Sequence, residues 1–184
     1  MKTNTLLSII ASSAIAAFTV SCGSKESTDT SSTQSSAPES GIPATVVSAT
    51  APDGALGVVE ARAAAKPGEA IVLRGKVGGK MTPISDTAAI LVLADENAIT
   101  SCDMNPDDQC TTPWDYCCEE ASTIAASTAT IQVLGDDGKL LRSTLRGTGD
   151  LKELSHLVVA GTVDAASTAE ALIVNADKIF IEKP

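Results

Sequence analysis

The sequence predicts a mainly β protein: an OB-like, five-stranded Greek-key barrel with a short N-terminal helix and a cysteine-rich insertion between strands 2 and 3. Three observations predict it. Five stretches have strand-like hydrophobic patterns, whereas helical stretches are few. A short helical turn between the third and fourth strands matches the element order of an OB-fold. The glycines in "RGKVGG" and "VAGTV" mark the bends and close backbone approaches that a small barrel needs. An open β-sandwich is the alternative.

The first predicted element is a helix of about three turns over residues 55–65, "ALGVVEARAAA". A Pro-Asp-Gly turn precedes this stretch and a Pro-Gly pair follows it, which is typical of helix boundaries. After the Pro-Gly pair the spacing of apolar residues changes from helical to alternating, so strands are expected from there on.

The strands follow in order. "AIVLRGKVGG" places Ile71, Leu73 and Val77 on one face, as in a half-buried strand. "AAILVLAD" is continuously apolar and predicts a central strand. "ATIQVLGDDGKLLRSTL" alternates and contains the hairpin signal Asp137-Gly138. "DLKELS" predicts one helical turn capped by Asp150, and "HLVVAGTV" and "ALIVNADKIFIEK" supply the last two strands.

Four of these stretches carry a resemblance. "VLRGKVGG", "CTTPWDYCCE", "LVVAGTV" and "LIVNADKIFI" resemble a family of small bacterial envelope proteins classed with OB-fold nucleic-acid-binding domains, over roughly residues 55–182. The Trp-Asp-Tyr-Cys-Cys string is the most specific part. The resemblance implies the OB-fold, in agreement with the pattern. Nucleic-acid binding would follow only by fold analogy, and a fold does not carry a function.

The N-terminus predicts export. Lys2 precedes a mainly apolar run, residues 6–20, that is shorter than the about 20 residues of a membrane-spanning helix. Residues 1–21 are therefore interpreted as a signal peptide. "FTVSCGS" resembles a lipobox with Cys22 as the lipidated residue, and an ordinary secretory signal is the alternative. Residues 22–45 would then hold the lipid and a disordered Ser/Thr-rich tether, and residues 46–184 the folded domain.

The expected location is therefore the cell envelope, with the protein lipid-anchored to the membrane and facing the periplasm.

The charge argues against a polyanionic partner. The chain has a net charge of −10, and aromatic residues make up only 2% of it. OB-folds that hold single strands need a basic groove and aromatic stacking platforms. Nucleic-acid binding is thus a distant alternative.

The insertion, residues 95–123, contains Cys102, Cys110, Cys117 and Cys118 in the spacing C-x7-C-x6-C-C. With Cys22 lipidated, an even number of thiols is left in an oxidising compartment, which predicts two disulfides. Neighbouring Cα atoms, about 3.8 Å apart, are too close for an ordinary bridge. Cys117 and Cys118 are therefore expected to pair with Cys102 and Cys110, in either order.

A metal site at these four cysteines is the alternative, with zinc or copper as the ion. The spacing differs from the C-x2–4-C of structural zinc sites, whereas copper(I) accepts thiolates and thioethers, and Met104 is close by. Asp103, Asn105 and Asp107 copy only part of a calcium loop. A redox-active thiol is disfavoured, because neighbouring carboxylates oppose the thiolate.

Trp114 and Tyr116 have two interpretations: a small core for the insertion, or exposed anchors for a partner. The single histidine, His156, supplies no acid–base set, so we predict neither an enzyme nor a cofactor. The sequence thus predicts an envelope-anchored, non-catalytic binding or adaptor lipoprotein for an unidentified protein or small ligand. Metal handling through the four cysteines is the rival.

Overall fold

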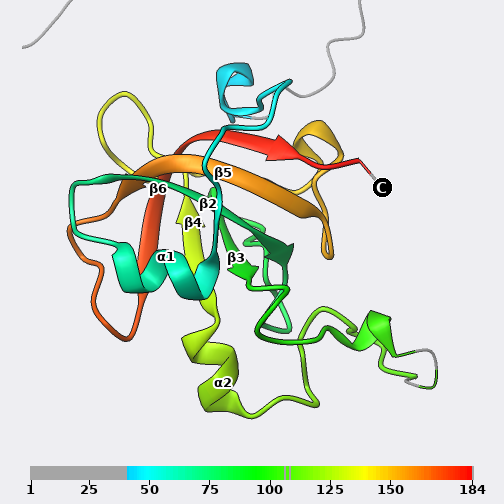
Figure 1. Cartoon of the computed structure of the whole chain (residues 1–184). Helices are drawn as coiled ribbons and strands as arrows, with labels where there is room; N and C mark the ends of the chain where they lie inside the picture. Colours follow the sequence, from blue (N-terminus) through cyan, green and yellow to red (C-terminus); the bar gives the residue numbers. More distant parts are fainter. Residues whose placement is uncertain (1–40, 106, 108, 184) are drawn as a thin grey trace, which may run out of the picture. The chain divides into compact units, whose positions relative to one another are not determined.

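The computed structural model describes residues 41–105, 107 and 109–183. The predicted signal peptide, Cys22 and most of the predicted tether lie outside the described residues. The described part is mainly β, with few helices (Figure 1). Its strands are β1 (Leu56–Gly57), β2 (Ala70–Val77), β3 (Ile90–Ala94), β4 (Thr128–Gln132), β5 (His156–Val163) and β6 (Leu172–Ile181). Its helices are α1 (Val58–Ala64), α2 (Ala121–Ala126) and the 3-10 turns η1 (Ala44–Val46), η2 (Cys102–Met104) and η3 (Thr148–Asp150).

Five strands close into a barrel. The sheet order is β1-β2-β3-β4-β6-β5, and an additional antiparallel pairing of β2 with β5 completes the ring. β4 and β6 are parallel, and the other neighbours in the ring are antiparallel. The short β1 pairs in parallel with β2 outside the ring. A closed barrel leaves few strand edges open to pairing with another chain.

The barrel core is built by alternation along the strands. Each of the five barrel strands contributes a side chain that is 0% exposed: Leu73, Leu91, Ile131, Val159 and Val174. The registers place these residues opposite one another, for example Leu73 against Val159 and Ile131 against Val174. Period-2 patterns of this kind predicted the strands, because alternate residues of a strand face the same side.

Two strand glycines mark close backbone approaches, as the sequence predicts. A Cβ on Gly75 would collide with the carbonyl oxygen of Ala94 on β3. A Cβ on Gly161 would collide with the carbonyl oxygen of Asn175 on β6, where the β5–β6 register shifts. Side chains at these positions would separate the strands, so only glycine permits the tight coiling.

The N-terminal segment packs on the barrel earlier than the predicted domain start at residue 46. Ile42 and Val46 are buried in the main core cluster, and the N–H of Ser48 donates to Ile179 O on β6 at 2.8 Å. Further along, α1 lies within the expected helical stretch and adds Val58 and Ala61 to the same core. Among the described residues, no helix is long and apolar enough to cross a membrane.

The expected helical turn over residues 150–155 is wrong. A 3-10 turn, η3, lies at Thr148–Asp150, and helical geometry is already interrupted within it at Gly149, whose φ is 59°. Asp150 and Leu154 both have positive φ values, 70° and 63°, and the N–H of Leu154 donates to Val77 O at 2.9 Å. The tertiary contact with β2 therefore overrides the local helix signal. The Asp137-Gly138 turn forms as predicted, with Gly138 at φ 72° and a bridge between Leu134 and Leu140.

Candidate functional site

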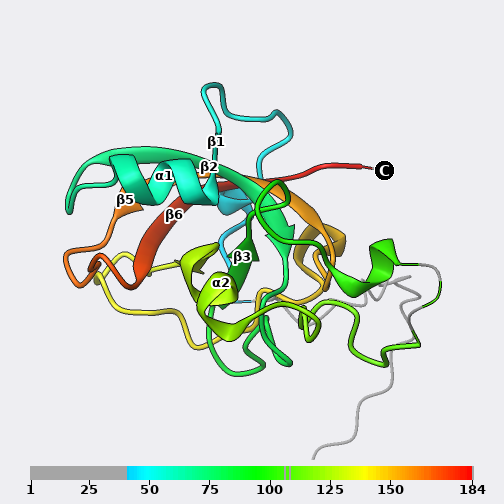
Figure 2. The ribbon, with the colours of Figure 1, turned by 60° about the horizontal axis from the view of Figure 1, so that its bottom comes forward.

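The cysteine-rich insertion joins β3 to β4, which are the second and third barrel strands. Its two ends meet, since the N–H of Asp95 donates to Ser127 O at 2.9 Å. The path between them contains η2, several turns and α2 (Figures 1 and 2). The insertion therefore carries regular structure of its own.

Pro113 to Tyr116, "PWDY", docks on a pair of glycines that follow β2. The N–H of Gly79 donates to Trp114 O at 2.8 Å, and the indole Nε1 of Trp114 donates to Met81 O at 3.0 Å. A Cβ on Gly78 would lie 2.6 Å from Trp114 O and 2.7 Å from Cε2 of Tyr116. Gly78 and Gly79, the last two residues of "RGKVGG", thus form the surface on which the "PWDY" segment packs.

Tyr116 anchors the insertion. Its side chain is 1% exposed and packs with Ala94, Ile99 and Ile124 in a second small core. Burial raises the pKa of Tyr116 to about 12, because the phenolate would be poorly solvated there. Its φ of 59° lies in the left-handed region, which turns the chain so that residues on either side of Tyr116 face back toward η2. Trp114 is half-buried.

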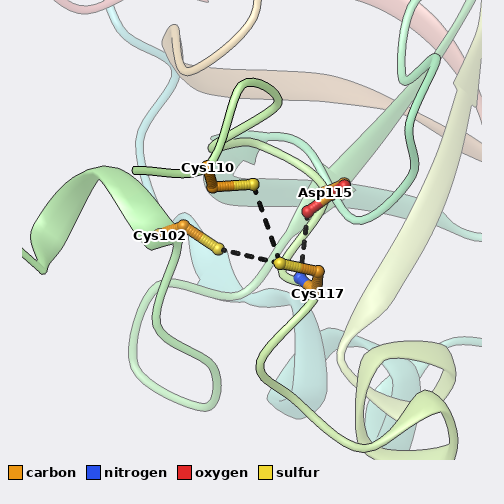
Figure 3. A group of neighbouring side chains, drawn as sticks. All are labelled: Cys102, Cys110, Asp115 and Cys117. Carbon is orange, nitrogen blue, oxygen red and sulfur yellow. Dashed lines mark hydrogen bonds between the residues drawn. The ribbon is translucent and has the colours of Figure 1, made fainter. Parts of the chain in front are cut away.

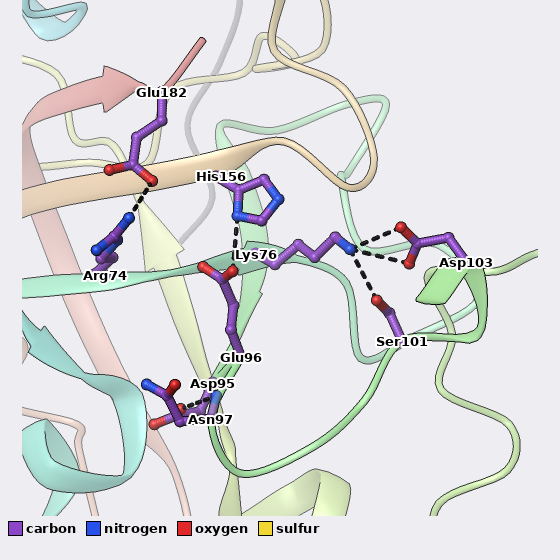
Figure 4. Close-up of polar contacts among 9 residues, drawn as sticks. All are labelled: Arg74, Lys76, Asp95, Glu96, Asn97, Ser101, Asp103, His156 and Glu182. Atoms are coloured by element: carbon purple, nitrogen blue, oxygen red, sulfur yellow. Dashed lines mark hydrogen bonds and ion pairs between the residues drawn. The ribbon is translucent and has the colours of Figure 1, made fainter. Parts of the chain in front are cut away.

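A buried lysine connects the barrel to η2 (Figure 4). Lys76 on β2 is 5% exposed. Its Nζ lies 2.8 and 3.0 Å from the two carboxylate oxygens of Asp103 and donates to Ser101 Oγ at 2.9 Å. Burial alone would raise the pKa of Asp103, but the bonds from Lys76 and Ser101 outweigh it and lower this pKa below its ordinary value.

Three thiols and one carboxylate meet beside this contact (Figure 3). Cys117 Sγ lies 3.7 Å from the sulfurs of both Cys102 and Cys110. One ligand atom from each of Cys102, Cys110, Asp115 and Cys117 lies within 4.8 Å of the others. η2 supplies Cys102, and the turn around Tyr116 supplies Asp115 and Cys117. Cysteines that are separated by seven and six residues in the sequence thereby lie next to one another.

The sulfur separations match metal ligation. Zinc–sulfur bonds of about 2.3 Å at tetrahedral angles place two sulfur ligands about 3.8 Å apart. A disulfide bond is about 2.05 Å long, so the 3.7 Å pairs Cys102–Cys117 and Cys110–Cys117 are not bridged. No disulfide bond joins the four cysteines within the described part of the chain. The two predicted disulfides stay a prediction for the oxidised protein.

The carboxylate of Asp115 is oriented by its own hydrogen bonds. Its Oδ1 accepts the N–H of Cys117 at 2.9 Å, and its Oδ2 accepts the hydroxyl of Thr112 at 2.7 Å. Thr112 Oγ1 also lies 3.8 Å from Cys110 Sγ. Such contacts fix the direction of a metal ligand and tune its basicity.

Solvent reaches the four groups unequally. Cys102 is buried, Cys110 and Asp115 are intermediate, and Cys117 is exposed. Hydrogen bonds with Cys110 and then Cys102 raise the pKa of the Cys117 thiol above its ordinary value. A metal ion would have to displace these thiol protons, as is general for thiolate ligands.

The structure thus sorts the residues singled out in the sequence. Cys118 lies outside the group of four possible ligands, although its neighbour Cys117 belongs to it. Of the calcium-like residues, Asp103 binds Lys76, and Asn105 Oδ1 accepts the backbone N–H of Asp107 at 3.2 Å. The sequence missed Asp115 as a possible ligand. The Asp-x-Cys spacing was its only signal.

Comparisons with protein-family models, with curated proteins and with solved structures give no match. The fold and the site therefore define the protein by themselves: a closed five-stranded β-barrel whose β3–β4 insertion gathers three thiols and a carboxylate.

Proposed function

We propose that this protein is a non-catalytic metal-binding module that holds one thiophilic ion, zinc in the first place. Cys102, Cys110, Cys117 and Asp115 are the ligands. The observation that carries the proposal is the pair of 3.7 Å sulfur separations around Cys117, with Asp115 within the same 4.8 Å group. Three sulfurs and one oxygen are a donor set that tetrahedral zinc accepts.

The irregular cysteine spacing ceases to be an objection once the fold is known. Structural zinc sites often take two ligands from one tight turn, which gives the C-x2–4-C pattern. Here Cys102 comes from η2, Asp115 and Cys117 come from the turn at Tyr116, and Cys110 comes from the loop between them; the contacts of Lys76 and of Gly79 hold η2 and the turn on the barrel. Copper(I), which favours three soft ligands, is the second metal that the sulfur set suits.

For the barrel, we propose the OB-like Greek-key class. The supporting observations are the closed order β2-β3-β4-β6-β5 and the parallel pair β4–β6, together with the resemblance that "CTTPWDYCCE" and the three strand stretches carry. We further propose that a lipid on Cys22 anchors the module in the envelope, and that nucleic acid is not its ligand. The net charge of −10 supports the second point.

Metal analysis of the full-length protein tests the proposal. Protein purified without chelators should contain one zinc per chain, and its reactive thiols should increase when a chelator removes the metal. Cys117→Ser should abolish stoichiometric binding. Cys118→Ser is the matched control, because it removes the adjacent thiol that lies outside the group, and it should retain the metal. Metal-free protein with two disulfides, whether or not reduced protein takes up zinc, would contradict the proposal.

A further inference from the structure

The metal site has one fixed side and one open side. Cys102 is buried, and its N–H donates to Pro113 O at 2.9 Å. It also neighbours Asp103, which the buried Lys76 holds. Cys117, whose sulfur lies 3.7 Å from the sulfurs of both Cys102 and Cys110, is exposed. An incoming ligand therefore reaches the group most easily at Cys117, between the intermediate Cys110 and Asp115 on one side and solvent on the other.

Asp115 is the ligand that an incoming group would displace most readily. It is the single oxygen donor among sulfurs, and thiophilic ions prefer sulfur. Both of its oxygens already accept hydrogen bonds, from Cys117 N–H at 2.9 Å and from Thr112 Oγ1 at 2.7 Å. These bonds do not depend on the metal, so the Asp115 carboxylate keeps its hydrogen bonds when the oxygen–metal bond breaks.

The charge around the open side indicates the kind of partner. Residues 95–123 contain eight acidic residues and no lysine or arginine; Asp95 is buried and Asp103 binds Lys76, but Asp115, Glu119 and Glu120 flank the exposed Cys117 in the sequence. The ligand set adds to this charge, since three thiolates and a carboxylate exceed the charge of a divalent ion by two. A basic partner would be attracted to such a surface, and an acidic one repelled.

We infer that the site passes its metal to a thiol group on a basic partner protein, by direct exchange at the Asp115 corner. This inference rests on the proposed metal-binding function. In the first step a sulfur–metal bond to the incoming thiolate forms and the Asp115 oxygen–metal bond breaks, while the proton of the incoming thiol goes to solvent. A second thiolate of the partner then binds the ion as Cys117 leaves and takes up a proton, and further ligands of the partner replace Cys110 and Cys102 in the same way. No electron is transferred.

Transfer from cobalt(II)-loaded full-length protein tests this inference, because the thiolate-to-cobalt absorption reports on the ligands. The receivers are two peptides with the same Cys-Gly-Gly-Cys centre, one flanked by lysines and one by glutamates. The transfer rate should rise linearly with peptide concentration. At low salt the lysine peptide should react about tenfold faster than the glutamate peptide, and the difference should shrink at high salt.

Substitutions at Asp115 should shift the rate in opposite directions. Asp115→Asn weakens the oxygen ligand and should speed transfer several-fold. Asp115→Cys replaces it with a soft ligand and should slow transfer about tenfold or more. Asp53→Asn, which removes an exposed carboxylate outside the insertion, is the control and should leave the rate unchanged.

Two outcomes separate the two levels of the argument. Stoichiometric binding with a release rate independent of peptide concentration and charge would overturn the transfer inference and leave a closed structural site. Failure of the wild-type protein to bind cobalt or zinc at all would overturn the proposed function, and the inference with it.

Discussion

Lys76 and Asp103 join the barrel to the cysteine insertion through a contact of 2.8 Å between Nζ and Oδ2. The lysine side chain is 6% exposed and the aspartate side chain 30% exposed. One partner belongs to β2, and the other lies in η2 directly after Cys102. The contact therefore positions the proposed metal ligand Cys102 by means of a barrel strand, so the stability of the barrel and the geometry of the site are linked.

Replacing Lys76 should lower the stability of the barrel and weaken metal binding at the site. Lys76→Met leaves Asp103 partly buried without its cation, so we expect a loss of about 1–3 kcal/mol in the free energy of unfolding. The affinity for zinc should fall as η2 shifts. Urea unfolding and competition with a chromophoric chelator measure the two effects.

The control is on the same strand. Arg74 pairs with Glu182 at 3.0 Å, but its side chain is 59% exposed. Arg74→Met should therefore change stability by at most about 1 kcal/mol and leave zinc affinity unaltered. Equal effects of the two substitutions on zinc affinity would contradict the positioning role of Lys76.

Gly78 tests the docking of the "PWDY" segment. A Cβ there would approach Trp114 O and the Tyr116 ring within 2.7 Å, so Gly78→Ala should displace the turn that carries Asp115 and Cys117. We expect a cost of about 1–3 kcal/mol and weaker zinc binding. Lys80→Ala, at an exposed neighbouring position, should stay within about 0.5 kcal/mol of wild type. Unchanged zinc affinity in Gly78→Ala would show that docking at this glycine does not shape the site.

The strands were predictable because the alternation of apolar and polar residues is a local property. The positions of Leu73 and Val77 within one stretch of chain already show which face of the strand is buried. The glycines Gly75 and Gly161 were likewise informative. The geometry of the candidate site was harder to predict from the sequence. Its geometry depends on the left-handed turn at Tyr116 and on a lysine 27 positions away from Asp103, and neither is visible in cysteine spacing. The helical turn predicted over residues 150–155 does not form for a related reason, since Leu154 contacts Val77 on β2.

Membrane association should depend on Cys22. In cells that export the protein, Cys22→Ala should move it from the membrane fraction to the soluble fraction, because the proposal places the anchor on the lipid of Cys22. Cys118→Ala serves as the control for loss of a cysteine. Retention of Cys22→Ala in the membrane fraction would refute the lipoprotein assignment.

Single-stranded nucleic acid should not bind. The chain has 23 acidic against 13 basic residues, and phosphate binding draws on clustered lysine and arginine. Fluorescence anisotropy with labelled oligonucleotides at about 150 mM salt should show no saturable binding. Micromolar affinity under those conditions would restore the function implied by fold analogy.

Zinc K-edge X-ray absorption of the full-length protein tests the central claim most directly. Three sulfur neighbours at about 2.3 Å and one oxygen neighbour at about 2.0 Å are expected, from Cys102, Cys110, Cys117 and Asp115. Asp115→Cys should convert this first shell to four sulfurs. A four-sulfur shell already in the wild type, or an ion bound by oxygen alone, would contradict the ligand set and with it the proposed role of the insertion.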